Sequence, residues 1–463
     1  MKTIFTFFTI FLFAFQANAQ CWQSVTSGLT HSMGIKTDGS LWAWGKNDYG
    51  QLGDGTLINK YIPTQIGNAT NWKTVSCGNN FTVAIQTNGT LWSWGDNLKG
   101  QLGNGTLVHT LTPTQVGSDT TWDSIDCGYY FCVALKGSFS KSLWTWGFNE
   151  YGQLGNGNNT DTNTPQQIGL STNWRSVSAG AYHAIALEFV NGGSRLMAWG
   201  INQYGQLGDN TVLSKNIPTQ IGTDVNWQTA VTGYFHSLAK KTTGTLWAWG
   251  YNGDGQLGSG NNINIYFPTQ ITTDTNWQGV LAAGYYHSMV KKTDGTLWVM
   301  GRNTYKELGI PAQVYTYIPK QMGTSTDWGN TISGSSGFSL ALRQDGNLYS
   351  WGSGIDGQLG IGNISLNAPS PALITCPPTL SIKDNNFEST TFSVYPNPAN
   401  DFVTIKSNYN ETISSLKIID VLGKTVFIQN NNETINIQNL TKGIYVIQIS
   451  TENINYIQKL IKN

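Results

Sequence analysis

A pentapeptide of the form Leu-Trp-x-Trp-Gly, first found at residues 41–45, recurs along most of the chain with occasional substitutions. A second tryptophan opens each unit, so all 18 tryptophans belong to the array. Such a repeat constrains the fold, because every copy must form the same small unit and bury its apolar face against a neighbour. The final glycine of the pentapeptide occurs seven times, at intervals of 50 to 53 residues: Gly45, Gly95, Gly147, Gly200, Gly250, Gly301 and Gly352.

The unit from Trp72 to Val116 illustrates the local structure. An Asn88-Gly89 turn separates two apolar runs, which predicts a β-hairpin. Side chains alternate along 91–95, so both tryptophan rings of that strand lie on one face. Three or four short strands in about 50 residues is the length of one blade of a β-propeller. Residues 20–375 are therefore predicted to form a seven-bladed β-propeller.

The amino-terminal residues have the pattern of a signal peptide. Lys2 precedes an apolar run over 4–15, and Ala17-Asn18-Ala19 fits a cleavage site, so residues 1–19 are expected to be removed. Later segments contain no apolar run long enough for a membrane helix. The formal net charge is zero, with 26 basic and 26 acidic residues, which argues against nucleic acid and acidic membranes as partners.

The composition changes after Cys376. Residues 376–390 are polar and are predicted to be a linker. Residues 391–463 contain alternating apolar segments separated by glycine-containing turns, which predicts a small β-sandwich. The fold class expected for the whole chain is thus all-β, with a seven-bladed propeller followed by a small sandwich.

The repeats resemble those of the regulator of chromosome condensation family. Gly-Gln-Leu-Gly, Pro-Thr-Gln-Ile-Gly and Gly-x-x-His-Ser-x-Ala-Leu elements recur in order across residues 21–375. This resemblance implies a seven-bladed propeller. The family's founding member is a nucleotide-exchange factor on chromatin, but the uncharged, exported character of this chain does not match that setting, so exchange activity is not expected.

The carboxyl-terminal module resembles the type A sorting domain of type IX secretion. The resemblance rests on Tyr-Pro-Asn-Pro at 395–398, an Asp-x-x-Gly-Lys turn at 420–424 and Leu-x-x-Gly-x-Tyr at 440–445. It implies that residues 391–463 engage the type IX secretion machinery. It also implies a secreted protein, or one on the outer cell surface of a Gram-negative bacterium, with the module itself open to cleavage on export.

Differences between the copies supply the candidate binding residues. Aromatic side chains cluster in units three to six, where other units carry Leu29, Asn79 or Ser336. They form either a binding surface, since tyrosine provides rigid amphipathic contact area, or aromatic packing between blades. Units five and six also place lysine where other units have Ile or Leu, and unit six is irregular at 300–309, which indicates either function or drift. The candidate residues are Tyr129, Tyr130, Tyr182, Tyr234, Phe235, Tyr285, Tyr286, Lys240 and Lys291.

Histidines and cysteines are explained mainly by the scaffold. Four histidines share one repeat position with three phenylalanines, which favours packing over metal binding, so neither a metal nor another cofactor is expected. Five cysteines are an odd number for an exported protein. Cys21 opens the array and Cys376 closes it, so a disulfide between them is a candidate that would clasp the ring, although the sequence leaves the pairing open.

No catalytic motif occurs in the sequence, and the acidic residues are scattered among turns. The preferred hypothesis is a binding protein, not an enzyme, that uses one propeller face for a protein or glycan ligand. One alternative is a secreted hydrolase with acids gathered at the propeller channel. Another is a passive structural or adhesive surface protein.

Overall fold

The computed structural model describes residues 21–311, 313–362, 367–377, 392–407, 412–420, 425–429, 434–450 and 455–463. Contacts group the chain into two compact units, with the boundary after Pro377. The predicted signal peptide and residues 378–390 of the predicted linker lie outside the described residues. Both remain predictions.

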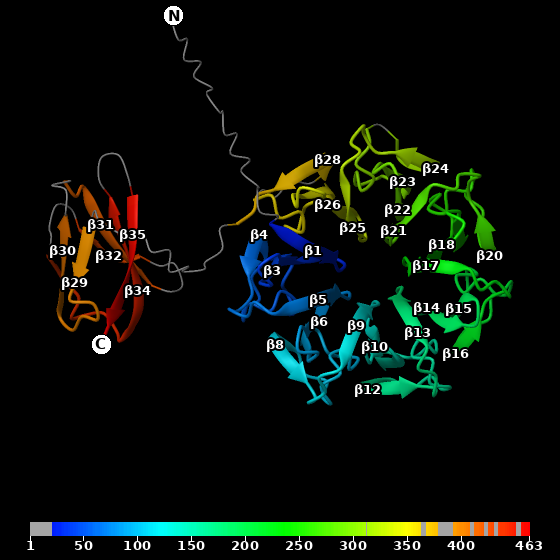
Figure 1. The fold of residues 1–463 in the computed structure, drawn as a ribbon, viewed down its shortest axis with the longest axis horizontal. Coiled ribbons are helices and arrows are strands. Elements are labelled where there is room, and N and C mark those ends of the chain that lie inside the picture. Colours follow the sequence, from blue (N-terminus) through cyan, green and yellow to red (C-terminus); the bar gives the residue numbers. More distant parts are fainter. Residues whose placement is uncertain are drawn as a thin grey trace, which may run out of the picture. The chain divides into compact units, whose positions relative to one another are not determined.

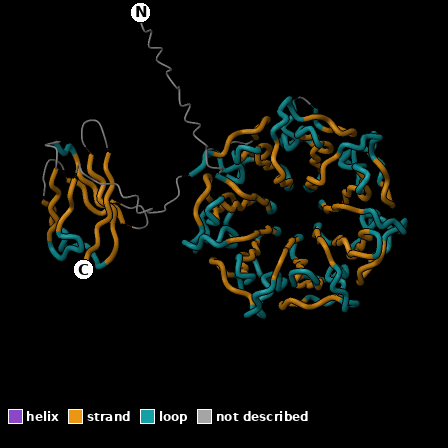
Figure 2. Tube along the Cα trace, in the orientation of Figure 1, coloured by secondary structure: helices purple, strands orange, loops and turns teal. Residues whose placement is uncertain are grey.

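The first unit consists of seven four-stranded antiparallel sheets arranged around a channel, as the repeat predicted (Figure 1). Each sheet is one continuous stretch of chain in which the strands follow in sequence order. The first strand of each blade lies nearest the channel (Figure 2). These inner strands are β1 (Trp22–Ser27), β5 (Trp72–Cys77), β9 (Trp122–Cys127), β13 (Trp174–Ala179), β17 (Trp227–Thr232), β21 (Trp277–Ala283) and β25 (Trp328–Gly334).

The remaining strands of each blade continue outward. The second strands are β2 (His31–Lys36), β6 (Phe81–Gln86), β10 (Phe131–Lys136), β14 (His183–Val190), β18 (His236–Lys241), β22 (His287–Lys292) and β26 (Phe338–Arg343). The third are β3 (Leu41–Gly45), β7 (Leu91–Gly95), β11 (Ser142–Gly147), β15 (Gly193–Gly200), β19 (Leu246–Gly250), β23 (Leu297–Arg302) and β27 (Leu348–Ser353). The outermost are β4 (Lys60–Gln65), β8 (Thr110–Val116), β12 (Thr162–Ile168), β16 (Lys215–Gln220), β20 (Ile265–Gln270), β24 (Tyr315–Gln321) and β28 (Asn367–Ile374).

Neighbouring blades are joined through the recurrent Gly-Gln-Leu-Gly loop. The indole N–H of Trp94 donates to the backbone carbonyl of Gln51 in the preceding blade, at 3.0 Å. Trp199 and Gln153 repeat this bond at 2.9 Å. These indoles are fully buried, so the bond satisfies a donor that water cannot reach. The loop motif is therefore a connector between blades, which explains its recurrence in the sequence.

The buried histidines also connect neighbouring blades. His236 Nε2 lies 2.9 Å from Ser288 Oγ in the next blade, and that hydroxyl donates its only proton to the Gln256 carbonyl. Nε2 must therefore be the protonated nitrogen of a neutral imidazole. Burial lowers the pKa of His236 to about 3. His31, His183 and His287 likewise lie beside a hydroxyl of the next blade, on Thr82, Ser237 and Ser339, and burial lowers the pKa of each to about 3.

The ring is closed by contacts between the first and seventh blades and by a disulfide. Among the described residues no sheet mixes strands from the two ends of the array, so each end completes its own blade. The Trp44 indole donates to the Gln358 carbonyl at 2.9 Å, continuing the pattern of the other blades. Cys21 and Cys376 form a disulfide with Cα atoms 6.1 Å apart. The predicted clasp is thereby confirmed.

The second unit is a two-sheet β-sandwich, as predicted. One sheet contains three strands and the other contains four, and they share an apolar core that includes Val403, Ile405, Ile418 and Ile447. The strands are β29 (Phe392–Tyr395), β30 (Phe402–Ser407), β31 (Ser415–Asp420), β32 (Thr425–Gln429), β33 (Thr434–Asn436), β34 (Gly443–Ser450) and β35 (Asn455–Lys462).

Candidate functional site

The predicted tyrosines lie on the turns that connect the first and second strands of blades 3 to 6. Backbone hydrogen bonds tie these turns together across blades: Tyr129 N–H donates to the Ala181 carbonyl at 3.2 Å, and Tyr234 N–H donates to the Gly284 carbonyl at 3.2 Å. Tyr285 N–H continues the pattern toward blade 7. The aromatic rings are thus carried by turns whose positions are set by the closed ring of blades.

A glycine precedes the aromatic residues of each of these turns because the blades approach closely there. A Cβ atom on Gly233 would lie 2.2 Å from Cε1 of His236 and 2.5 Å from the Gly284 carbonyl oxygen. Both distances are far inside van der Waals contact, so a larger residue would push neighbouring blades apart. The local sequence therefore brings the turns, and the rings that follow them, toward the axis.

The rings from four blades meet one another. Centroids of Tyr234 and Tyr285 are 4.3 Å apart, and those of Tyr129 and Tyr285 are 6.3 Å apart although two blades separate them. Tyr182 contacts both Tyr129 and Tyr234, at 5.6 and 6.3 Å. These separations are in the range of favourable aromatic pairs. The structure thus brings together all seven aromatic residues that the repeat singled out.

Four further rings extend this surface outward, and sequence reasoning missed them. Tyr151 lies 5.5 Å from Tyr182, and Tyr204 lies 5.0 Å from Tyr251 and 5.1 Å from Phe235. Comparing the residues after the pentapeptide across units would have revealed them. We call the combined surface the tyrosine face: Tyr129, Tyr130, Phe148, Tyr151, Tyr182, Tyr204, Tyr234, Phe235, Tyr251, Tyr285 and Tyr286.

The phenols of the tyrosine face stay neutral. Burial raises the pKa of Tyr234 to about 12 and raises that of Tyr285 well above its usual value. The tyrosine rings are partly buried against one another, and part of each remains accessible. They therefore offer apolar ring surface together with neutral hydroxyl groups, which suits stacking and hydrogen bonding.

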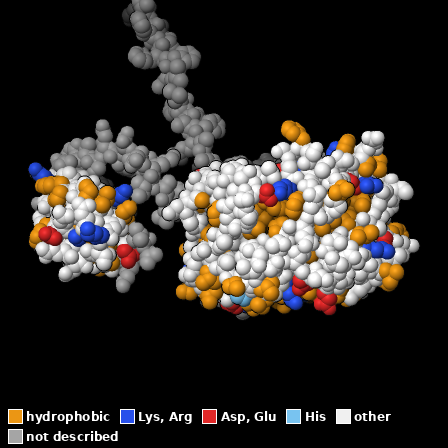
Figure 3. All heavy atoms as spheres, turned by 90° about the horizontal axis from the view of Figure 1, so that it is seen from below, with side chains coloured by type: hydrophobic (Ala, Val, Ile, Leu, Met, Phe, Trp, Pro, Cys, Tyr) orange, Lys and Arg blue, Asp and Glu red, His pale blue; other side chains and the backbone are white. Residues whose placement is uncertain are grey.

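Apolar side chains also lie at the rim on the same side of the propeller. The loops between third and fourth strands begin beside the tyrosine-bearing turns, since Tyr251 N–H donates to the Phe235 carbonyl at 2.8 Å. Seen edge-on, hydrophobic side chains gather along the lower edge of the propeller and also appear across its side, with a few charged groups among them (Figure 3). Exposed apolar residues of these loops include Leu57, Ile58, Leu107, Val108, Val212, Leu213, Ile263 and Val314.

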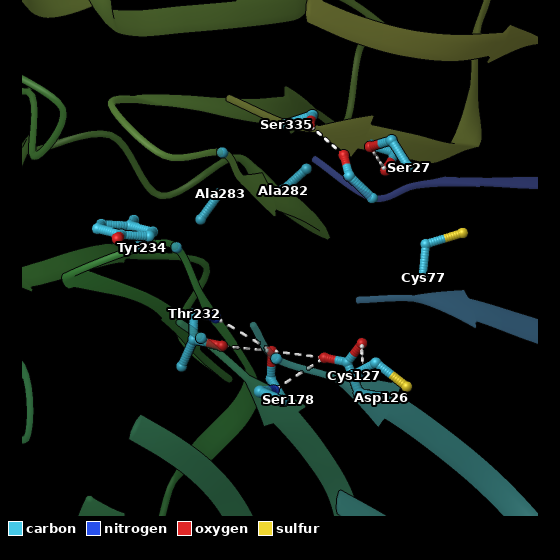
Figure 4. Close-up of a pocket in the computed structure, with 18 of the residues that line it drawn as sticks. Ser27, Cys77, Asp126, Cys127, Ser178, Thr232, Tyr234, Ala282, Ala283 and Ser335 are labelled. Carbon is cyan, nitrogen blue, oxygen red and sulfur yellow. Dashed lines mark hydrogen bonds between the residues drawn. The ribbon is translucent and has the colours of Figure 1, made fainter. Parts of the chain in front are cut away.

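Behind the tyrosine face lies a cavity of about 270 Å³ in the channel, formed by the ends of all seven inner strands. Tyr129, Tyr234 and Tyr285 form part of its wall. Hydroxyl and backbone groups form much of the remainder, and Figure 4 shows Asp126, Ser178 and Thr232 directed toward one another. The tyrosines therefore serve both an outer face and an inner cavity.

Asp126 is the acidic member of this wall, and sequence reasoning missed it. Its carboxylate accepts hydrogen bonds from Ser76 Oγ (3.0 Å), Cys127 N–H (3.1 Å), Ser178 Oγ (3.1 Å) and Ala179 N–H (2.9 Å). Burial nevertheless raises its pKa. Thr26, Ser76 and Ser178 occupy the same register in other blades, so a comparison of units could have identified the substitution.

The cavity bears on the hydrolase alternative. Asp126 is the single carboxylate among the residues that line it, within the described part of the chain. Glycoside hydrolysis of the common kind needs two carboxyl groups on opposite sides of the bond. The acids gathered at the channel, which that alternative requires, are therefore not found at this cavity.

Lys240 and Lys291 lie away from the tyrosines. Their stems are buried, with 7% and 4% of each residue exposed. Lys240 Nζ donates to the Gln228 side chain at the start of β17, whereas Tyr234 follows the end of that strand, about 20 Å away at the usual rise per residue. Lys291 similarly donates to the Gly329 carbonyl at the start of β25, at 3.0 Å. The structure does not join the two groups into one site.

The irregular sixth unit contains a compensated pair. Glu307 replaces the loop glutamine and is fully buried, and Arg302 Nε lies 3.0 Å from its carboxylate. The Arg302 guanidinium also stacks 4.1 Å from the Tyr286 ring centroid. The charge that glutamate adds is therefore matched within the blade, next to the tyrosine face.

The three remaining cysteines are buried thiols. Cys127 and Cys132 face each other across β9 and β10, with Sγ atoms 3.2 Å apart, and Cys77 lies in the neighbouring blade. Burial raises the pKa of each of these thiols. They are therefore protonated and poorly nucleophilic at neutral pH.

Seven four-stranded blades around a channel define the class of this protein as a seven-bladed β-propeller, here with a separate β-sandwich. The chain belongs to the regulator of chromosome condensation (RCC1) repeat family. That family's repeat matches residues 38–85, 88–135, 142–187, 195–239, 243–290 and 345–384. Residues 393–463 match the secretion system C-terminal sorting domain, which indicates export by type IX secretion to the cell surface or beyond. Both resemblances are confirmed.

Known proteins similar to this chain include two from Arabidopsis thaliana. The ultraviolet-B receptor UVR8 is 27% identical over 241 residues, covering 51% of this chain and 54% of the receptor. The mitochondrial RCC1 domain-containing protein RUG3 is 30% identical over 236 residues, covering 48% of this chain and 52% of RUG3. The chain thus spans about half the length of these curated relatives.

Solved structures show the same fold. Prp20p from Saccharomyces cerevisiae, described with its binding to Gsp1p and histones, has a TM-score of 0.65 at 21% identity, covering 81% of this chain and 90% of Prp20p. Human WBSCR16 has a TM-score of 0.64 at 22% identity, covering 73% of this chain and 94% of WBSCR16. At these identities the likeness concerns the fold alone.

No helix among the described residues is long and apolar enough to cross a membrane.

Proposed function

We propose that this protein is an exported binding protein that captures a protein or glycan ligand through the tyrosine face. The observation that carries the proposal is the continuous surface of eleven aromatic rings on blades 3 to 6. Tyrosine offers large, rigid contact area at low cost in conformational entropy, which suits recognition of polypeptides and of sugar rings. The apolar rim enlarges the area available to a ligand.

The aromatic side chains are confined to four of the seven blades, and this supports a binding role. Blades 1, 2 and 7 carry Leu29, Asn79 and Ser336 at the corresponding turns and still pack into the same propeller. The blade scaffold therefore does not require aromatic residues at these turns. Prp20p, which has a similar fold, binds Gsp1p and histones, so a protein ligand is compatible with this fold.

The deciding experiment compares ligand capture by the wild-type chain and by Tyr234→Ala/Tyr285→Ala. Each protein is immobilised and tested on a glycan array and in pull-downs from environmental and host extracts. We expect at least tenfold weaker capture by the double variant. The matched control is Tyr315→Ala/Tyr317→Ala, which removes a stacked, exposed pair from the outermost strand β24 and leaves the tyrosine face intact.

Two outcomes would reject the proposal. Equal capture by the wild-type chain and Tyr234→Ala/Tyr285→Ala would remove the tyrosine face from the binding site. A complete lack of specific capture would favour the passive structural or adhesive alternative.

We also propose that residues 391–463 deliver the propeller to the outer surface of a Gram-negative bacterium, through the type IX machinery. Residues 393–463 match the sorting domain over nearly this whole range. Deletion of residues 391–463 should leave the propeller in the periplasm of a host that has this secretion system, measured by fractionation. Unchanged appearance at the surface would contradict this assignment.

A further inference from the structure

The wall of the channel cavity contains an unusual negative charge. All four donors to the Asp126 carboxylate are neutral hydroxyl or backbone N–H groups. None of the ion pairs among the described residues involves Asp126, and the lining of the cavity contains no lysine, arginine or histidine. The carboxylate therefore concentrates negative potential in a narrow channel with protein on all sides.

Aromatic ring surface faces the same space. Tyr129, Tyr234 and Tyr285 line the cavity together with Asp126, and Tyr129 lies three residues after it on the same blade. Ring faces carry partial negative charge and attract cations, most strongly when both partners are shielded from water. The carboxylate and the ring faces therefore both favour a positively charged ligand.

We propose that this cavity binds an aliphatic ammonium group, with the positive head toward Asp126 and the alkyl stem against those surfaces of Tyr129, Tyr234 and Tyr285 that line the cavity. The inference rests on the proposed function in one respect, because these tyrosines also belong to the tyrosine face. It adds the chemistry of the ligand: a lysine side chain presented by a partner, or a free alkylamine.

The geometry distinguishes this ligand from other cations. A volume of about 270 Å³ is small for a ligand pocket and suits a single charged group on a short chain. A guanidinium group favours two free carboxylate oxygens for its planar fork, and both Asp126 oxygens already accept two hydrogen bonds, whereas an ammonium group is a compact point charge that can donate to other oxygens of the wall. Among the described residues no group of three or more histidine, cysteine or acidic side chains could hold a metal ion, so a metal cation is not favoured in this cavity.

The test uses n-butylammonium and the full chain in isothermal titration calorimetry, with n-butanol as the uncharged comparison. We expect saturable binding of n-butylammonium and at least tenfold weaker binding of n-butanol. Equal binding of the two compounds to the wild-type chain would overturn the proposal without any variant being needed.

Asp126→Ser is the informative variant, because Ser76 and Ser178 already occupy this register. Ser178 Oγ accepts the Thr232 N–H at 3.1 Å, so serine can accept the corresponding bond from the next blade. We expect Asp126→Ser to weaken n-butylammonium binding at least tenfold. Asp123→Asn, on the same strand but paired with Lys73 and Lys141 outside the cavity, should bind like the wild-type chain.

Two further ligands separate the sources of the ammonium group. Tighter binding of Nα-acetyl-lysine amide than of 1,5-diaminopentane would indicate a protein side chain, and the reverse order would indicate a free amine. Unchanged n-butylammonium binding by Asp126→Ser would reject the ammonium site. The proposal of capture through the tyrosine face would still stand, because its own test is the Tyr234→Ala/Tyr285→Ala variant.

Discussion

Tyr234 and Tyr285 come from neighbouring blades, and their ring centroids lie 4.3 Å apart at an interplanar angle of 33°. The contact joins the two blades at the end of the channel, where backbone hydrogen bonds already link the turns. Both tyrosines are partly buried, and part of each ring remains accessible. The pair is therefore a bridge on the surface of the ring, and the core of each blade lies elsewhere.

Tyr234→Ala/Tyr285→Ala should cost little stability. Blades 2 and 7 carry Asn79 and Ser336 at the same turn, and an aromatic pair contributes about 0.5–1.5 kcal/mol beyond the burial of its surface. We expect a fall in Tm of less than about 4 °C, measured by scanning calorimetry at neutral pH. A fall of 10 °C or more would mean that the rings are structural, and loss of ligand capture could then not be assigned to direct contact.

Acidification below about pH 6.5 should destabilise the propeller. Each of the four buried histidines has its pKa lowered to about 3, so each is neutral in the folded chain. The unfolded chain binds up to four more protons between pH 6.5 and pH 3, and the free energy of unfolding therefore falls as pH falls. The slope approaches about 1.4 kcal/mol per pH unit for each histidine.

His236→Phe tests this linkage with a residue that other blades already use, as at Phe338. Ser32 faces Phe338 and still donates to the Gln358 carbonyl, at 2.9 Å. Chemical denaturation between pH 4.5 and 7.5 gives the free energy of unfolding at each pH. Its slope against pH should be shallower in the variant, by an amount that corresponds to uptake of up to one proton fewer on unfolding. An unchanged slope would show that His236 is protonated in the folded chain.

Loss of the Cys21–Cys376 disulfide should destabilise the ring more than loss of a buried thiol. The disulfide spans 355 residues, and removal of a native disulfide commonly costs about 2–5 kcal/mol. Cys21→Ser/Cys376→Ser should therefore unfold at lower denaturant concentration. Cys77→Ser is the matched control, since Ser27 occupies its register in blade 1. Identical unfolding of the two variants would show that closure depends on noncovalent contacts alone.

Replacing Arg302 alone should destabilise the fold more than replacing Arg302 and Glu307 together. Arg302→Ala leaves the fully buried Glu307 without its cation, which costs about 3–5 kcal/mol for a buried pair. Arg302→Ile/Glu307→Gln restores residues found at these positions in blade 4, Ile201 and Gln206. Denaturant midpoints should rank the double variant above Arg302→Ala. The opposite ranking would show that Glu307 is not charged in the folded chain.

The spacing of the tryptophans and glycines determined the number of blades, their boundaries and the all-β class, because each unit encodes local strands and turns with a fixed period. It also identified the aromatic turns of blades 3 to 6, and the ends of the array suggested the disulfide. These are local properties of each repeat or of the chain ends. They can be read without knowing how distant units meet.

Tertiary structure alone decided which of these features share a site. Closure of the ring placed Asp126 among hydroxyl groups of neighbouring blades and brought Tyr129 within 6.3 Å of Tyr285. It also separated Lys240 from Tyr234, although they are only six positions apart in sequence. The physical reason is that position along a strand sets which end of the channel a side chain reaches, whereas the packing angle between blades sets its distance from other units.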